Sequence, residues 1–174
     1  MPSKKRMHKV NISTIANEHS HDYELKTFEK GNMSHMKRKR VLLLSINDFN
    51  QIKRSIEYVD IKDPIVYKCI NRLKYILRKA EVVLPTEIPK NVITLNSRVG
   101  LQILGTDKKF EINIVLPDNS EVNEEYMSVF SQIGTAIIGN TIGDIVRCEL
   151  PSGPYDIFIE RIIYQPEASG NFFL

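Results

Sequence analysis

The chain has no tryptophan, only two cysteines, and no histidine after residue 35. All four histidines lie within the first 35 residues, so the usual Ser–His and Cys–His catalytic arrangements are excluded from the rest of the chain. The two cysteines, Cys69 and Cys148, are too few for a disulfide framework or a cysteine-based zinc site. We expect both thiols to be buried and to behave as small apolar groups, and we expect no metal site.

Phosphate-binding loops and long apolar runs are also missing. The eight glycines are scattered, and none stands in a GxGxxG or GxxxxGK[S/T] frame. The apolar run from Val41 to Leu44 ends at Ser45, far short of the roughly 20 residues that a membrane helix needs and too soon for a secretory signal. These absences favour a cytoplasmic binding protein over an enzyme, and we expect a monomer with no cofactor and no membrane contact.

Positive charge is concentrated at the N-terminus. Residues 1–40 carry ten Lys/Arg and four Asp/Glu, a net charge of +6, whereas residues 41–174 carry fourteen against seventeen, a net charge of −3. The first 40 residues show no sustained apolar period, so we expect a basic, disordered leader. A weak contact with nucleic-acid phosphates is one hypothesis for this leader, and a solvated tail is the other. The residues that would make the phosphate contacts are Lys37, Arg38, Lys39 and Arg40.

Residues 45–80 show the pattern of two helices that fold back on each other. Ser45 followed by Asp48 resembles a capping box, and Asp63-Pro64 is a second helix start. Narrow apolar stripes favour a short coiled-coil hairpin over residues 41–81 that projects from the rest of the chain, and a helix pair lying on the main core is the alternative. The stripes are Ile46, Phe49, Ile52 and Ile56, then Val66, Cys69, Ile70, Leu73, Ile76, Leu77 and Ala80.

From residue 82 onward the pattern becomes that of a sheet. Pro85 and Pro89 exclude a continuing helix and predict an extended crossover. Ser131 predicts the start of a short helix that ends at Gly139-Asn140. We therefore expect an α+β domain over residues 82–174, an antiparallel sheet of four or five strands with one short helix across it, able to fold without the hairpin. The strands are predicted at 99–103, 110–116, 143–150 and 155–164, with a hairpin turn at 105–108.

One segment resembles the signature of the C-terminal domain of the Gre transcript-cleavage factors. It reads Met127-Ser-Val-Phe-Ser-Gln-Ile-Gly-Thr-Ala-Ile-Ile-Gly-Asn140 and is followed by Ile142-Gly-Asp144. Two further stretches, Val92-Ile-Thr-Leu-Asn-Ser-Arg-Val99 and Tyr164-Gln-Pro-Glu-Ala168, are similar to the regulators of nucleoside diphosphate kinase. The resemblance covers about residues 42–174 and implies an FK506-binding-protein-like fold without isomerase activity.

The resemblance also implies a partner, since Gre-type domains dock on bacterial RNA polymerase at the rim of its secondary channel. Gln132 departs from the family pattern, because Gre factors have proline at this position. Carried over by position, the docking residues are Ser128, Ser131, Gln132, Ile133 and Thr135.

Gre factors insert a long coiled coil into the channel, and acidic residues at its tip help to hold a catalytic Mg²⁺. The helices expected here would reach only about 18–25 Å at ~1.5 Å per residue, roughly half the Gre arm. Asp60 and Asp63 lie at the expected tip, where a turn residue and a helix N-cap are the simpler roles.

The sequence therefore predicts a non-enzymatic regulator of transcription elongation that occupies the channel rim and competes with Gre-type factors without cleaving RNA. A shortened transcript-cleavage factor and a nucleic-acid-binding protein that acts through its basic leader are the alternatives. An effect on nucleoside diphosphate kinase, direct or through its expression, is a further hypothesis that the residues do not decide.

Overall fold

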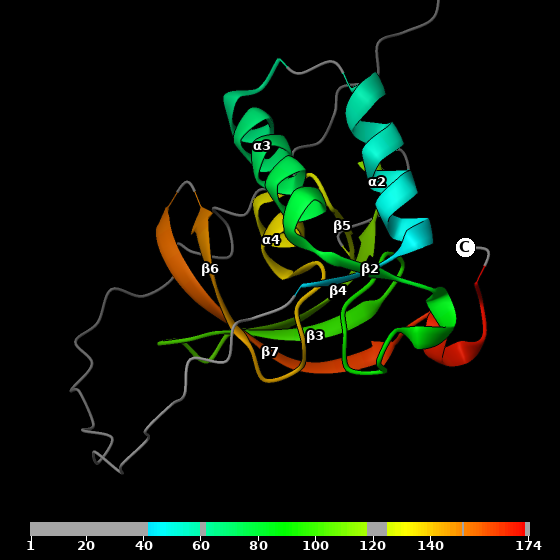
Figure 1. Cartoon of the computed structure of the whole chain (residues 1–174). Helices are drawn as coiled ribbons and strands as arrows, with labels where there is room; N and C mark the ends of the chain where they lie inside the picture. Colours follow the sequence, from blue (N-terminus) through cyan, green and yellow to red (C-terminus); the bar gives the residue numbers. More distant parts are fainter. Residues whose placement is uncertain (1–41, 60–61, 118–124, 151, 173–174) are drawn as a thin grey trace, which may run out of the picture. The chain divides into compact units, whose positions relative to one another are not determined.

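The computed structural model describes residues 42–59, 62–117, 125–150 and 152–172, and these form α+β structure (Figure 1). The predicted basic leader and Asp60 lie outside the described residues. The elements, in chain order, are β1 (Leu43–Ser45), α2 (Ile46–Tyr58), α3 (Pro64–Lys79), β2 (Glu81–Val83), a 3-10 turn (Pro85–Glu87), β3 (Arg98–Ile103), β4 (Lys109–Val115), β5 (Tyr126–Ser128), α4 (Gln132–Ile137), β6 (Ile145–Leu150), β7 (Gly153–Tyr164) and a second 3-10 turn (Glu167–Ser169).

The larger sheet has five strands in the order β5-β4-β3-β7-β6. All neighbouring pairs are antiparallel except β4 and β5, which run parallel. One face of this sheet supplies core residues such as Leu101 and Ile159, which have no exposed surface. The short helix α4 packs against β6 and β5. The predicted α+β class is therefore confirmed, with β5 as a three-residue edge strand that is too short to show an apolar alternation.

Both predicted helix starts are confirmed by their capping bonds. Ser45 Oγ accepts a hydrogen bond from the backbone N–H of Asp48 at 3.1 Å and begins α2. Asp63 Oδ1 accepts one from the backbone N–H of Ile65 at 2.7 Å, and Pro64 is the first residue of α3. Each bond satisfies one of the backbone donors that a helix N-terminus leaves unpaired.

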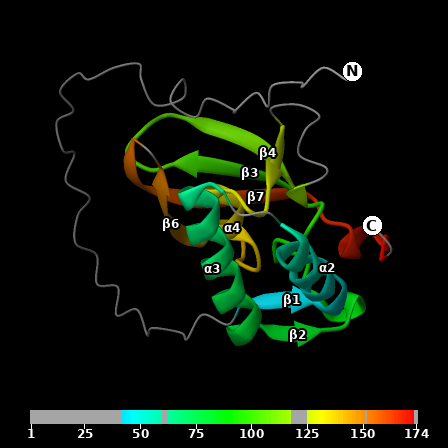
Figure 2. The same cartoon turned by 90° about the horizontal axis from the view of Figure 1, so that it is seen from above.

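The two long helices do not project as a separate hairpin, which corrects the interpretation of the narrow apolar stripes. Ile70 and Leu73 of α3 have no exposed surface, and Ile52 of α2 is 1% exposed. Two helices in isolation cannot cover their contact residues this completely, and α3 contacts α4 as well as α2. Both views show α2 and α3 on the side of the five-stranded sheet where α4 lies (Figures 1 and 2).

A second, two-stranded parallel sheet joins the chain before α2 to the chain after α3, and the sequence did not reveal it. Leu43 of β1 pairs with Glu81 of β2. The backbone N–H of Leu43 also donates to the carbonyl of Gly139 at 3.3 Å. Gly139 has a φ of +74°, and a Cβ there would lie 3.0 Å from the Leu43 oxygen. These contacts connect the helical segment to the sheet domain, so the packing argues against the expectation that residues 82–174 fold alone.

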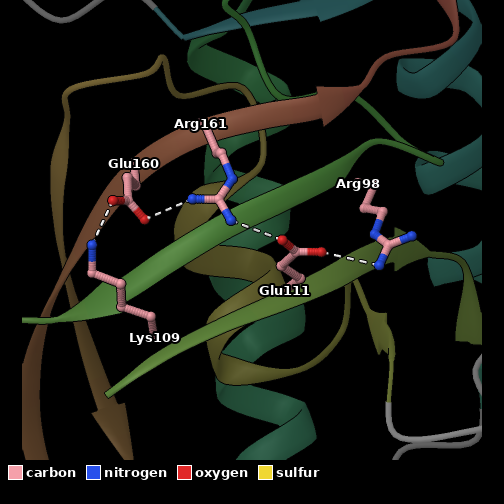
Figure 3. Close-up of polar contacts among 5 residues, drawn as sticks. All are labelled: Arg98, Lys109, Glu111, Glu160 and Arg161. Carbon is pink, nitrogen blue, oxygen red and sulfur yellow. Dashed lines mark hydrogen bonds and ion pairs between the residues drawn. The ribbon is translucent and has the colours of Figure 1, made fainter. Parts of the chain in front are cut away.

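The opposite face of the five-stranded sheet carries a chain of ion pairs (Figure 3). The register between β3 and β7 shifts beside Gly100, and this bulge allows the sequence neighbours Glu160 and Arg161 to contact each other on one face. Gly100 leaves room for Arg161, because a Cβ at this glycine would lie 2.9 Å from the arginine Cγ. The linked pairs are Lys109–Glu160 at 2.6 Å, Glu160–Arg161 at 3.1 Å, Arg161–Glu111 at 2.8 Å and Glu111–Arg98 at 3.0 Å.

Candidate protein-docking site

The turn from β5 into α4 is built by the serines and the glycine of the Gre-like segment. Ser128 Oγ accepts a hydrogen bond from the backbone N–H of Phe130 at 3.1 Å, and Ser131 Oγ accepts one from Gly134 at 3.0 Å. A Cβ on Gly134 would lie 2.2 Å from the backbone oxygen of Ser128, so only glycine allows this close approach. The shape of this turn therefore depends on serine at positions 128 and 131 and on glycine at position 134.

The five predicted docking residues fall into two groups in the structure. Ile133 and Thr135 are 4% and 1% exposed, so they position the turn and offer almost no surface to a partner. Thr135 Oγ1 donates to the Val129 carbonyl at 2.7 Å. Ser128, Ser131 and Gln132 are partly exposed: Ser128 ends β5, and Ser131 and Gln132 lie at the start of α4.

A pocket of about 190 Å³ lies where α3, α4 and β6 meet. Gln132 forms part of its wall, and its Nε2 donates to the backbone carbonyl of Glu149 on β6. Two of the predicted docking residues, Gln132 and Thr135, thus share one hollow with residues of α3. The lining residues are Ile65, Lys68, Cys69, Arg72, Gln132, Thr135 and Glu149.

Lys68 and Arg72 give the pocket a cationic side. They are four residues apart on α3, which places them on the same helix face, and both are exposed. Arg72 Nη1 makes one long contact with the Arg147 carbonyl, at 3.5 Å. Within the described ranges neither cation forms an ion pair with a carboxylate. Two positive charges therefore face solvent beside the hollow, and only Glu149 opposes them among its lining residues.

The thiols near the pocket are not activated for chemistry. Burial raises the pKa of the Cys69 thiol, which lies in the pocket lining, and raises that of Cys148 to about 12. Both thiols are thus protonated at neutral pH, and a thiolate is the form that acts as a nucleophile. The pocket can hold a polar or anionic group, but the protonated Cys69 in its lining supplies no nucleophile.

The expected hairpin tip contributes no metal site in the described residues. The Asp63 carboxylate is bound to the backbone of its own helix as an N-cap, and Asp60 falls outside the described part of the chain. Among the described residues no three His, Cys, Asp or Glu side chains are grouped to hold a metal ion. In the same part of the chain, no helix has the length and apolar character to span a membrane.

Sequence reasoning missed Lys68 and Arg72, although a signal for them exists. α3 contains five basic residues and no acidic one. A helix with this composition has an exposed cationic face, which a helical projection of the sequence would reveal. Their place beside α4 follows only from the packing of the helices. The five basic residues are Lys68, Arg72, Lys74, Arg78 and Lys79.

The sheet domain that contains this turn matches a known protein family, and the chain is similar to two curated proteins. Residues 88–164 match the model of the family described as "Transcription elongation factor, GreA/GreB, C-term". The chain is 32% identical over 99 residues to the regulator of nucleoside diphosphate kinase of Escherichia coli strain K12, covering 56% of this chain and 73% of that protein. It is 29% identical over 150 residues to transcription elongation factor GreA of Helicobacter hepaticus, covering 84% of this chain and 92% of that protein.

A solved structure shows the same fold. The prokaryotic transcription elongation factor GreA/GreB from Nitrosomonas europaea aligns with a TM-score of 0.60 and 26% sequence identity, over 72% of this chain and 100% of that chain. The family match begins at residue 88, so it includes α4 and β6 but not α3 (residues 64–79). The cations of the pocket therefore come from outside the matched segment.

Proposed function

Because the chain carries the GreA/GreB C-terminal domain and belongs to the family of the regulators of nucleoside diphosphate kinase, we propose that it binds bacterial RNA polymerase at the rim of the secondary channel. There it competes with Gre-type factors and regulates elongation without cleaving RNA. The observation that carries this proposal is the turn at Ser128, Ser131 and Gly134, which lies inside the family match and holds the start of α4 in one position. A preorganised turn loses little conformational entropy when it binds a partner.

The helical segment supports a role that occupies the rim without chemistry. α2 has 13 residues and α3 has 16, which correspond to about 20 Å and 24 Å at ~1.5 Å per residue. Both helices are packed over the sheet domain through buried residues such as Ile52 and Leu73. The Asp63 carboxylate is already used as a helix cap, so it is poorly placed to hold a metal ion for cleavage.

Direct binding to core RNA polymerase tests the proposal. Ser131→Arg removes the cap and places a bulky charge at the start of α4, so we expect a clear loss of affinity, on the order of tenfold or more. Ser169→Arg is the matched control, because Ser169 is exposed and lies in the second 3-10 turn, outside the pocket lining. Circular dichroism must first show that both variants are folded. Equal affinity of both variants and the unchanged protein would contradict the proposed docking site.

We place this function in the cytoplasm, with the protein acting as a monomer.

Contact of the leader residues Lys37 to Arg40 with nucleic acid stays a prediction, because these residues lie outside the described part of the chain. Its test is the salt dependence of binding with and without residues 1–40. A second candidate function is an effect on nucleoside diphosphate kinase, which the name of the Escherichia coli relative suggests. Measuring that enzyme's activity and abundance tests it.

A further inference from the structure

The exposed cations of α3 include two pairs with the same composition and spacing. Lys68 and Arg72 form the first pair, and Lys74 and Arg78 form the second, and the two members of each pair are four positions apart. Like charges at this spacing on a helix repel each other. No member of either pair forms an ion pair with a carboxylate in the portion that the structure describes. The fold itself therefore gains nothing from these charges through ion pairing.

The two pairs differ in what lies beside them. A shift of six residues turns a helix by roughly 240°, so the second pair points away from the direction of the first. Lys68 and Arg72 line the pocket together with Ile65, whereas Lys74 and Arg78 do not. Ile65 is 43% exposed, an apolar surface directly beside the two cations. Only the first pair thus combines positive charge, a hollow and an apolar contact.

We infer that this pocket receives an acidic side chain of the partner protein, with its carboxylate between Lys68 and Arg72 and a neighbouring apolar residue against Ile65. This inference rests on the proposed docking to RNA polymerase. Arginine binds carboxylates through two parallel hydrogen bonds, which gives direction as well as attraction. Glu149 on the other side of the pocket repels a carboxylate and so directs it toward α3.

A protein carboxylate fits the charge distribution better than a nucleic-acid strand does. Residues 41–174 carry a net charge of −3, so this part of the chain lacks the broad positive field that attracts a polyanion. The pocket also contains the carboxylate of Glu149, which would face a phosphate backbone. A single acidic side chain needs only the two local cations.

The two pairs provide a matched experiment on the full chain. Affinity for core RNA polymerase is measured for K68E/R72E and for K74E/R78E, which change the net charge equally. At about 0.15 M salt, where charges are screened beyond roughly 8 Å, only close contacts differ strongly. We expect a loss on the order of tenfold or more for K68E/R72E and less than about threefold for K74E/R78E. Thermal melts check that both variants fold, and K68Q/R72Q, which adds no repulsion, should weaken the salt dependence of binding.

The outcomes separate this inference from the proposed function. If Ser131→Arg weakens binding while K68E/R72E binds like the unchanged protein, the acidic-partner inference is overturned and the docking proposal stands. Equal losses in K68E/R72E and K74E/R78E overturn the inference too, because they indicate a general charge effect. A fluorescein-labelled single-stranded RNA is the second probe: loss of RNA binding in K68E/R72E with polymerase affinity retained would assign the pocket to nucleic acid. If the unchanged protein does not bind polymerase, the proposed function and the inference fail together.

Discussion

The carboxylate of Asp48, in the first turn of α2, accepts a hydrogen bond from the backbone N–H of Leu95 at 3.0 Å, across 47 residues of sequence. Asp48 is 4% exposed. Close by, Thr94 Oγ1 donates to a carboxylate oxygen of Glu167 at 2.7 Å. Burial is the largest influence on Asp48 and, with the nearby charge of Glu167, raises its pKa from 3.8 to about 7, although the bond from Leu95 lowers it. This contact connects the helical segment to the chain that leads into β3.

The raised pKa of Asp48 predicts that folding stability falls as pH rises. Between 3.8 and about 7 the folded protein holds a proton on Asp48 that the unfolded chain has lost. The contribution is fully present below pH 3.8 and is lost as pH rises through about 7, with an upper limit of roughly 4 kcal/mol. Denaturant unfolding from pH 5 to pH 8 should show the part of this loss that falls above pH 5, and Asp48→Asn should remove most of it because the amide carries no charge. Parallel curves for the two proteins would refute the assignment.

Packing of α3 into the core predicts a large cost for truncating its buried face. Leu73 has no exposed surface, so Leu73→Ala should lower the free energy of unfolding by about 2–5 kcal/mol. Tyr75, two residues away and 54% exposed, is the control, and Tyr75→Ala should change it by only ~0.5 kcal/mol. Similar small effects of both substitutions would indicate a helix pair that projects from the domain.

The close contact at Gly134 predicts that a methyl group added at this position is not tolerated. Gly134→Ala places a Cβ against the Ser128 backbone oxygen, where the available distance is only 2.2 Å. Ser131→Ala removes the helix cap alone and should cost ~1 kcal/mol. We expect Gly134→Ala to lower the melting temperature more than Ser131→Ala, because backbone must move to relieve the clash. The opposite order in thermal melts would show that α4 shifts without cost.

The capping role of Asp63 predicts that its charge is dispensable for polymerase binding. Asn can accept the same bond from Ile65, so Asp63→Asn should leave α3 and the affinity for polymerase nearly unchanged. Asp63→Ala loses the cap and should lower stability by ~1 kcal/mol. Loss of activity in Asp63→Asn with unchanged stability would instead indicate that the carboxylate acts at the tip.

Features with local causes could be predicted from the sequence. The helix starts at Ser45, Asp63 and Ser131 follow from short capping patterns, and β3, β4, β6 and β7 follow from apolar alternation, whereas the three-residue β5 does not. The pairing of β1 with β2 could not be predicted, because each strand has three residues and their partners are far apart in sequence. The pocket depends on how α3 packs against α4, which neither helix pattern specifies.

The proposal that this chain competes with GreA for RNA polymerase without cleaving RNA is tested by displacement of fluorescently labelled GreA from core RNA polymerase, combined with an RNA cleavage assay on stalled elongation complexes. We expect saturable displacement whose midpoint, corrected for the concentration and affinity of labelled GreA, agrees with the directly measured Kd. We also expect the chain to suppress cleavage stimulated by GreA and to cause none when added alone. Failure to displace GreA at concentrations that saturate direct binding, or RNA cleavage stimulated by the chain itself, would contradict the proposed function.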